Sequence, residues 1–545
     1  MEVAVARSQA LSDVAGRTRG GSRHSRPPAS LWLPAALVAV AVAIPLVYLL
    51  LRAFGAGGEI WDLLLRRRTL EILGRTVALA GTVTTLCALI TLPLAWLIVR
   101  TDMPLRRTCR VLSALPLVIP SYVAGLVVVA ALGPRGALQQ LLAPLGVERL
   151  PEIYGFPGAT LTVTMVAFPY MLLTLMASMR GLDPCLEEAS RSMGCSPWRT
   201  FWRVVFPQLR PALAAGGLLV ALYSLRDFGA VSLLKYETFT WAIYLQYQTS
   251  FDRVLAAALA VIPVLIAVIF LVVEMRTRGR SRYHRATGTA RPSALVRLGQ
   301  WKLLALSFCS LVILLSVALP VAVLGYWLGK GFSNAEPLRL AWSTVANSGY
   351  ASALAAAVAA VAAIPVAILS VRHSSKPSVL LERATYVGFA LPGIVIALAL
   401  VFFAANYAPV VYQTLGLLVV AYVILFLPQA VGSAESSLRQ VNPHIEDAAR
   451  SLGSSPTKVI RTITVPLLRP GIVAGAALVF LTAMKELPAT LILGPIGFKT
   501  LATSAWSAAS EGLFASAALP ALLLLLVSSA PMAFLTLSQR KGEGL

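Results

Sequence analysis

One stretch of sequence occurs twice: DPCLEEASRSMGCSPWRTFWRVVFPQLRPAL at residues 183–213 and NPHIEDAARSLGSSPTKVIRTITVPLLRPGI at residues 442–472. The two copies align without a gap at an offset of 259 residues, which pairs Pro207 with Pro466. A long internal repeat indicates that the chain contains two copies of one structural unit.

Each copy predicts a hairpin of two short helices. Gly194 and Gly453 follow the first helix, where glycine tolerates the left-handed backbone that ends a helix. Ser196-Pro197 and Ser455-Pro456 come next. Serine caps a helix start and proline suits the first helical turn, so a second helix begins there. We expect this second helix to end before the aligned prolines.

Long apolar runs surround both copies. Of the 545 residues, 58% are hydrophobic and 13% are charged, whereas about a quarter of a soluble chain is charged. Runs of about 18 or more apolar residues are long enough to cross a bilayer as a helix, so we predict an all-α polytopic membrane protein. We expect about twelve spans, near 31–53, 76–99, 111–132, 158–180, 212–234, 254–275, 302–329, 346–370, 383–405, 412–433, 471–495 and 515–537.

The repeat divides these spans into two halves. Each half holds an even number of spans, so the halves share one orientation and form parallel repeats. Upstream of the duplicated stretch the offset becomes 272, which pairs Pro120 with Pro392, so the first half carries 13 extra residues near 134–157. The predicted organisation is an N-terminal tail (1–30), a first half (31–275, with its loop at 183–213), a basic linker (276–301), a second half (302–537, with its loop at 442–472) and a C-terminal tail (538–545).

Basic residues gather in alternate loops. If the N-terminus is cytoplasmic, most of the 46 Lys and Arg residues lie on that side, including those of the linker 276–301. This is the positive-inside bias of membrane proteins. It predicts that both termini and both duplicated loops are cytoplasmic, and it explains the net charge of +23 without a nucleic-acid partner. Arg66, Arg67 and Arg68 are the exception, because they fall outside.

The duplicated loops have the composition of a docking element. Acidic residues begin the first helix, and the second carries Trp198, Phe201 and Trp202 in the first copy. The alternative is an ordinary surface hairpin that only ties two spans together. Identical spacing in two copies favours docking.

Both loops resemble the signature loop of permease subunits in bacterial binding-protein-dependent ABC importers. That resemblance implies the type I permease fold and a coupling helix that sits in a groove of the ATPase subunit. Ser190 replaces the second alanine of the motif in the first copy, and Asp447 replaces its glutamate in the second. The residues that match, and to which the resemblance assigns ATPase coupling, are Glu188, Ala189 and Gly194 in the first half and Asp447, Ala448, Ala449 and Gly453 in the second.

An ATP-binding motif is absent from this sequence. The phosphate-binding pattern G-x-x-x-x-G-K-[ST] does not occur. We therefore expect no enzymatic activity and no cofactor in this chain, with ATP and Mg²⁺ used by separate subunits. The resemblance implies two copies of an ABC ATPase subunit, an extracytoplasmic substrate-binding protein and the inner membrane of a bacterium.

Two acidic residues, Asp227 and Glu486, fall at equivalent positions inside predicted spans, beside Arg226 and Lys485. An ionisable residue within the membrane suggests a functional site, because it is costly to bury in lipid. In one interpretation both carboxylates line the transport pathway near its outer mouth, where their oxygens would suit a hard cation. In the other they form structural ion pairs across the interface between the halves.

Two further pathway candidates, Tyr236 and Glu511, fall in segments expected to be external loops or re-entrant. All four histidines fall on the cytoplasmic side, and the five cysteines lack metal-ligand spacing. We therefore assign no metal site.

The substrate is indicated by resemblance alone. Residues 226–247 (RDFGAVSLLKYETFTWAIYLQY) and 484–524 resemble the corresponding segments of fused permeases of ferric iron importers. Permeases for thiamine, sulfate, phosphonates and polyamines share the loop motif, so thiamine or phosphonate is the alternative substrate. An ion-coupled secondary transporter and a channel are the other classes, but neither explains the duplicated cytoplasmic loop.

Overall fold

The structure is a computed structural model that describes residues 29–55, 65–134, 136–146, 150–249, 258–266, 268–269, 295–333, 342–373 and 375–542. Within these residues nearly all regular structure is helical, and the only β-type pairing is one isolated bridge between Thr101 and Val296. The predicted all-α class is confirmed.

The first half contains α2 (Ala29–Gly55), α4 (Arg67–Arg100), α5 (Arg106–Leu112), α6 (Ser121–Leu132), α7 (Ala137–Leu142), α8 (Phe156–Arg180), α9 (Pro184–Ser192), α10 (Pro197–Thr200), α11 (Phe206–Arg226), α12 (Gly229–Leu233) and α13 (Phe239–Thr249). The second half contains α15 (Lys302–Ile313), α16 (Leu319–Ser333), α17 (Trp342–Arg372), α18 (Lys376–Ala390), α19 (Gly393–Tyr407), α20 (Leu415–Gln440), α21 (His444–Ser451), α22 (Pro456–Val459), α23 (Val465–Met484), α24 (Pro488–Leu493), α25 (Leu501–Ser510) and α26 (Phe514–Gly542).

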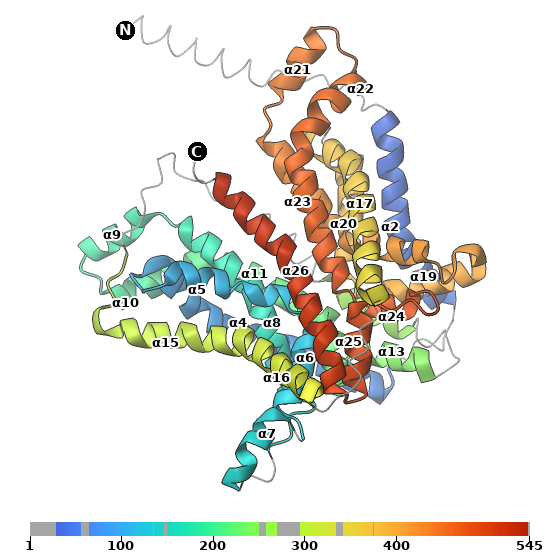
Figure 1. Cartoon of the computed structure of the whole chain (residues 1–545). Helices are drawn as coiled ribbons and strands as arrows, with labels where there is room; N and C mark the ends of the chain where they lie inside the picture. Colours follow the sequence, from blue (N-terminus) through green and yellow to red (C-terminus); the bar gives the residue numbers. More distant parts are fainter. Residues whose placement is uncertain are drawn as a thin grey trace, which may run out of the picture.

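Each half forms one arm of the molecule (Figure 1). The hairpin α9–α10 lies at the far end of the first arm, and α21–α22 lies at the far end of the second. The arms meet around α6, α24 and α25. The first helix of each half crosses to the other arm, since α2 packs on α17, α18 and α19 while α15 and α16 pack on α5 and α6. Hydrogen bonds from Tyr48 to Phe402 and from Trp327 to Ala130 fix these crossings.

Nine helices in the described part of the chain are long and apolar enough to cross a membrane, and the bent pair α18–α19 would make a tenth. The predicted span near 515–537 corresponds to α26, whose first part, Phe514–Ser529, is apolar. Half of the predicted span near 254–275 lies outside the described residues. Twelve spans therefore stay a prediction.

The two halves use the same close helix contact. A Cβ placed on Gly216 of α11 would lie 3.0 Å from Cα of Met171 in α8, and one placed on Gly475 of α23 would lie 2.9 Å from Cα of Ala430 in α20. Both pairs are related by the offset of 259 residues. Small residues allow membrane helices to approach this closely, so the repeat in sequence is also a repeat in packing.

The third predicted span of each half is broken at a proline. Pro120 precedes α6 and Pro392 precedes α19, and α18 and α19 meet at 101°. The residues before these prolines, Ile119 and Leu391, have extended backbones, which is the conformation that a following proline favours. The sequence predicted these spans as continuous, and that prediction is wrong.

We predicted that the second helix of each hairpin ends before Pro207 or Pro466, and this prediction is wrong. The helix continues through a π-helical turn, Phe201–Val205 or Ile460–Thr464, into α11 or α23. The wider π turn accommodates a proline that has no N–H to donate and whose ring would crowd an earlier carbonyl. Two unbroken connecting helices result, Pro197–Arg226 and Pro456–Met484.

Candidate functional site

A cavity of about 230 Å³ lies between the two halves. It is lined by the ends of broken helices, because α11 and α23 end there while α6, α12, α19 and α24 begin there. Irregular backbone within a membrane protein is tolerated where it is buried in protein or lines a cavity. Discontinuous helices of this kind commonly form the substrate sites of transporters.

Asp227 and Glu486 both line this cavity, and each caps a short helix. The Asp227 Oδ2 atom accepts hydrogen bonds from the backbone N–H groups of Ala230 (3.1 Å) and Val231 (3.3 Å) in α12. The Glu486 Oε1 atom accepts one from the N–H of Ala489 in α24, at 3.2 Å. The spans predicted at 212–234 and 471–495 are therefore interrupted at these residues. The reason is that carboxylates bind the free N–H groups of a new helix start.

The cations beside these carboxylates reach across the interface. Lys485 Nζ of the second half donates a hydrogen bond to the carbonyl oxygen of Leu117 in the first half, at 2.6 Å. The charges of Arg226 in the first half and Glu486 in the second interact electrostatically. Each half thus contributes one cation and one carboxylate to the lining of the cavity.

Small and polar groups complete the cavity. A Cβ on Gly393 would lie 2.6 Å from Oε1 of Glu486, so any larger residue at position 393 would clash with this carboxylate. Ser121 occupies the equivalent position in the first half and hydrogen-bonds Asp227. Tyr122 also lines the cavity, and its hydroxyl is buried without a hydrogen-bond partner within the described structure.

The other two pathway candidates lie elsewhere. Tyr236 donates a hydrogen bond from its hydroxyl to the carbonyl of Arg75 (3.1 Å) and packs on Phe156, away from the central cavity. Glu511 is exposed and lines a separate cavity of about 660 Å³ beside α25. The central cavity gathers Asp227 and Glu486 but not these two residues.

The two hairpins have the predicted local geometry at their turns. Gly194 and Gly453 have φ angles of +82° and +85°. Ser196 caps α10 by accepting a hydrogen bond from the N–H of Arg199. Ser455 makes no such bond; its hydroxyl instead lies 3.4 Å from that of Thr457.

Most of the motif residues assigned to ATPase coupling face outward. Ala449 is half-buried, and the exposed ones are Glu188, Ala189, Gly194, Asp447, Ala448 and Gly453. Exposed Leu186 and Met193 on the first hairpin, and Ile445 and Leu452 on the second, lie among them. Each hairpin thus presents a small surface that mixes acidic, apolar and flat glycine positions.

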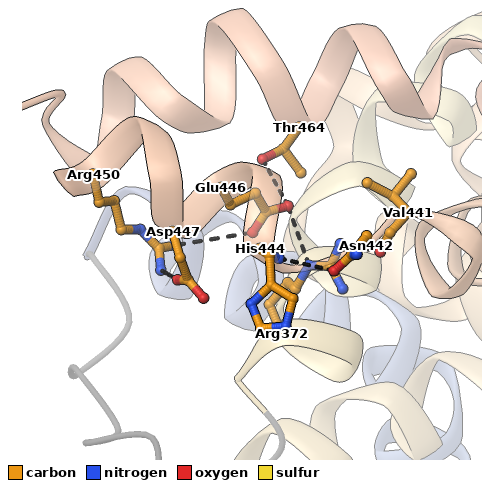
Figure 2. Close-up of polar contacts among 8 residues, drawn as sticks. All are labelled: Arg372, Val441, Asn442, His444, Glu446, Asp447, Arg450 and Thr464. Carbon is orange, nitrogen blue, oxygen red and sulfur yellow. Dashed lines mark hydrogen bonds and ion pairs between the residues drawn. The ribbon is translucent and has the colours of Figure 1, made fainter. Parts of the chain in front are cut away.

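Sequence reasoning missed Glu187 and Glu446, the residues just before the acidic motif positions. Glu187 forms an ion pair with Arg100, and Glu446 forms one with Arg372 at 3.1 Å. Figure 2 shows that Glu446 contacts Arg372 and Thr464 and also pairs with Arg450 at 3.9 Å, while Asp447 pairs with Arg450 at 3.2 Å. The repeat could have identified both pairs, because the arginines align at the offset of 272 and the glutamates at 259.

The departure of Ser190 from the motif has a local explanation. The Ser190 hydroxyl is buried and lies 3.1 Å from that of Thr200, which joins α9 to α10. The equivalent residues of the second hairpin are Ala449 and Val459. A polar pair in one half therefore replaces an apolar pair in the other.

The basic cluster that contradicted the charge rule is partly neutralised. Arg67 pairs with Glu71 at 2.9 Å, and Arg68 and Arg75 both pair with Glu237, at 2.9 and 3.3 Å. Among the residues that the structure describes, no cluster of three or more His, Cys, Asp or Glu side chains could hold a metal ion.

Comparison with known proteins supports the interpretation of the repeat. The profile of the family described as "binding-protein-dependent transport system inner membrane component" matches twice, at residues 92–278 and 359–541. Each match contains one hairpin and one connecting helix.

Three relatives show how far the similarity extends. The Fe(3+)-transport system permease protein FbpB 2 of Haemophilus influenzae is 36% identical over 93% of this chain and 98% of its own length. The ferric transport system permease protein FbpB of Actinobacillus pleuropneumoniae is 26% identical, and the chain spans 59% of its length. The molybdenum transport system permease protein ModB of Mycobacterium tuberculosis is 30% identical over 46% of this chain and 95% of its own length, so it corresponds to one half.

The predicted resemblance to permease subunits is confirmed by these matches. The chain belongs to the family of binding-protein-dependent transport system inner membrane components, with two copies of the family domain in one multi-pass polypeptide.

Proposed function

We propose that this chain is the substrate-conducting permease subunit of an ATP-driven importer and that its substrate is ferric iron. The observation that carries the proposal is the continuity of each connecting helix. One end of that helix belongs to a hairpin, and the other ends at the cavity shared by the halves. A force applied to the hairpins would therefore reach the cavity through a single rigid element.

The partners follow from the two hairpins. One copy of an ABC ATPase subunit binds each hairpin on the cytoplasmic side, and these subunits use ATP and Mg²⁺. An extracytoplasmic binding protein delivers the substrate to the opposite face. Both termini are cytoplasmic, the halves extend over 31–275 and 302–537, and the membrane is the inner membrane of a bacterium.

The motif residues make the ATPase contact. Glu188, Ala189 and Gly194 act in the first hairpin, and Asp447, Ala448, Ala449 and Gly453 act in the second. Their outward exposure supports this role. When ATP closes the two ATPase subunits, both hairpins move, and the halves rock about the cavity between them. The pathway then opens alternately to the two sides of the membrane.

Ferric iron is supported by the name of a relative that matches over nearly its full length, the Fe(3+)-transport system permease protein, and by the chemistry of the cavity. Fe³⁺ is a hard cation that favours oxygen ligands. The cavity offers the carboxylates of Asp227 and Glu486. Tyr236 and Glu511 lie away from this cavity, so any contact they make with the substrate comes before the substrate enters the cavity.

The experiment is uptake by proteoliposomes that contain the chain with its ATPase and binding-protein partners. Radiolabelled ferric iron is compared with radiolabelled thiamine, with ATP or with a non-hydrolysable analogue inside. We expect iron to accumulate only with hydrolysable ATP, and thiamine not to accumulate. Accumulation of thiamine instead of iron would refute the substrate, and accumulation of iron without ATP would refute the importer class.

A further inference from the structure

Two buried ion pairs tie the hairpins to membrane-spanning helices. Arg100, the last residue of α4, bonds through Nη2 to Oε1 of Glu187 in α9. Arg372, the last residue of α17, bonds through Nε to Oε1 of Glu446 in α21, at 3.1 Å. None of these four side chains is more than 15% exposed.

The two ion pairs are copies of each other. The arginines are related by the offset of 272 residues and the glutamates by that of 259, so each pair joins the same two elements in its own half. Removing one partner of a buried pair leaves an uncompensated charge, which is strongly unfavourable. Separating the hairpin from the end of the span would break the pair in either half. In the second half, Arg450 of the same hairpin would keep its contact with Glu446, at 3.9 Å.

Further contacts extend each ion pair to the π turn of the connecting helix. In the second half, Glu446 accepts a hydrogen bond from Oγ1 of Thr464, the last residue of its π turn, at 3.2 Å (Figure 2). In the first half, the Arg100 guanidinium lies 5.6 Å from the ring centre of Trp96, and this ring packs edge-on at 5.1 Å against Phe201. Both halves thus join the span, the hairpin and the connecting helix at one point.

We propose that Arg100–Glu187 and Arg372–Glu446 are positioning pairs that make each hairpin move as one body with α4 or α17 and with its connecting helix. This inference rests on the proposed function, because it specifies how movement of the ATPase reaches the spans. The pairs do not contact the ATPase or the substrate; they transmit displacement.

A positioning role and a purely stabilising role predict different losses of activity when a pair is broken. The assembled complex with a broken pair should still bind the ATPase and hydrolyse ATP, because the exposed motif residues are unchanged. It should move less substrate for each ATP hydrolysed, because the hairpin yields instead of carrying the span with it. The informative quantity is therefore the ratio of iron imported to ATP hydrolysed.

The variants are Arg372→Glu, Glu446→Arg and the double exchange, with Arg100→Glu and Glu187→Arg for the first half. In the full complex we expect each single variant to lower the iron-to-ATP ratio by about fivefold or more, which is the size of typical coupling between sites. The double exchange in the first half should recover much of the ratio, since it restores an opposite-charge pair. In the second half the recovery should be smaller, because Arg450 lies 3.9 Å from Glu446 and would repel an arginine there. Equal amounts of ATPase should co-purify with all variants.

Glu446→Gln is a milder variant, because it keeps an oxygen for Thr464 and removes only the charge. This variant still tests the inference if the charge-reversal variants do not fold. The matched control is the exposed pair Arg67–Glu71 at the opposite end of α4, whose side chains are 93% and 49% exposed. Reversing either of its charges should leave the ratio unchanged.

A substrate-independent measurement separates this inference from the proposed function. Hydrogen exchange of α21 and of the last turn of α17 is followed in the assembled complex, with and without a non-hydrolysable ATP analogue. In Glu446→Gln, the amides of α21 should exchange faster, and their exchange should no longer depend on the nucleotide analogue. The amides of the membrane-spanning helices should stay protected. If the native complex imports no iron, the proposed substrate fails and the exchange data still decide the role of the pairs. The inference about the pairs would be overturned if the single variants changed neither the iron-to-ATP ratio nor the hydrogen exchange. It would also be overturned if a loss of ATPase binding accounted for the whole effect.

Discussion

Asp227 and Glu486 occupy equivalent positions in the two halves, and each carboxylate caps the short helix that begins beside the same cavity. Each residue thus has two possible tasks, one in holding the broken helix together and one in facing the pathway. Conservative and drastic substitutions separate the two tasks.

Asp227→Asn and Glu486→Gln remove the charge but keep an oxygen that can accept the cap hydrogen bonds. We expect slower iron uptake with normal ATPase binding and nearly unchanged thermal stability. Asp227→Ala should in addition lose about 1 kcal/mol of stability, because the helix loses its cap. Uptake rates and melting temperatures of the purified complex measure both effects. Native transport kinetics in the Asn and Gln variants would remove both residues from the pathway.

Tyr122→Phe tests the buried, unpaired hydroxyl of a residue that lines the cavity. Removing a buried polar group that has no partner should leave stability unchanged or raise it by about 1 kcal/mol. Uptake should nevertheless slow if the hydroxyl contacts the substrate.

Tyr422→Phe is the matched control, because the Tyr422 hydroxyl lies 2.6 Å from that of Thr490 and is satisfied. It should lower the melting temperature and affect uptake less than Tyr122→Phe. Identical transport by the two variants would contradict a role for Tyr122 in the pathway.

Ser190→Ala tests whether the polar pair of the first hairpin is compensated. The substitution leaves Thr200 with a buried hydroxyl that has lost its partner, and it should cost about 1–3 kcal/mol of stability. Ser190→Ala with Thr200→Val reproduces the Ala449–Val459 pair of the second hairpin and should restore most of that loss. A melting-temperature cycle of the four proteins gives the coupling. Additive effects would show that the two hydroxyls act independently.

Asp102 should make the start of the second half sensitive to acid. Its carboxylate accepts hydrogen bonds from Lys302 Nζ (2.8 Å) and from the N–H of Leu298 (2.9 Å), and these bonds, with Lys302 first, lower the pKa of Asp102. A carboxyl with a lowered pKa stabilises the fold above its unfolded pKa, and this contribution is lost as the pH falls through the lowered value. Exchange of the Leu298 amide should therefore stay protected at neutral pH and lose protection only in strong acid. In Asp102→Ala the protection should be lost at every pH; if that variant exchanges like the native protein, the contact is unimportant.

The hairpins could be predicted because their geometry is encoded locally. The glycines at 194 and 453 have positive φ angles, and a Ser-Pro pair begins the next helix in both copies, with a serine cap in the first. The breaks at Asp227 and Glu486 could not be read from hydropathy, since apolar residues continue on both sides. The useful signal was a carboxylate two residues before Gly229 or Pro488, both of which suit a new helix start.

The ion pairs were missed for a different reason. Glu187 and Glu188 are neighbours on a helix, where successive side chains point in different directions. The motif favoured the outward residue, whereas the inward one meets Arg100 in the folded chain. The continuation of both connecting helices through Pro207 and Pro466 likewise depends on π turns, which local rules about proline do not anticipate.

The central claim is that the two hairpins couple ATP hydrolysis to movement of the pathway. Its most direct test is the ratio of iron imported to ATP hydrolysed in the double variant Gly194→Val/Gly453→Val, since valine is strained at both positive φ angles. Gly146→Val is the control, because Gly146 has φ +81° in the extra loop of the first half. We predict that the double variant hydrolyses ATP with little or no iron uptake, while the control transports normally. Full uptake by the double variant would contradict the claim.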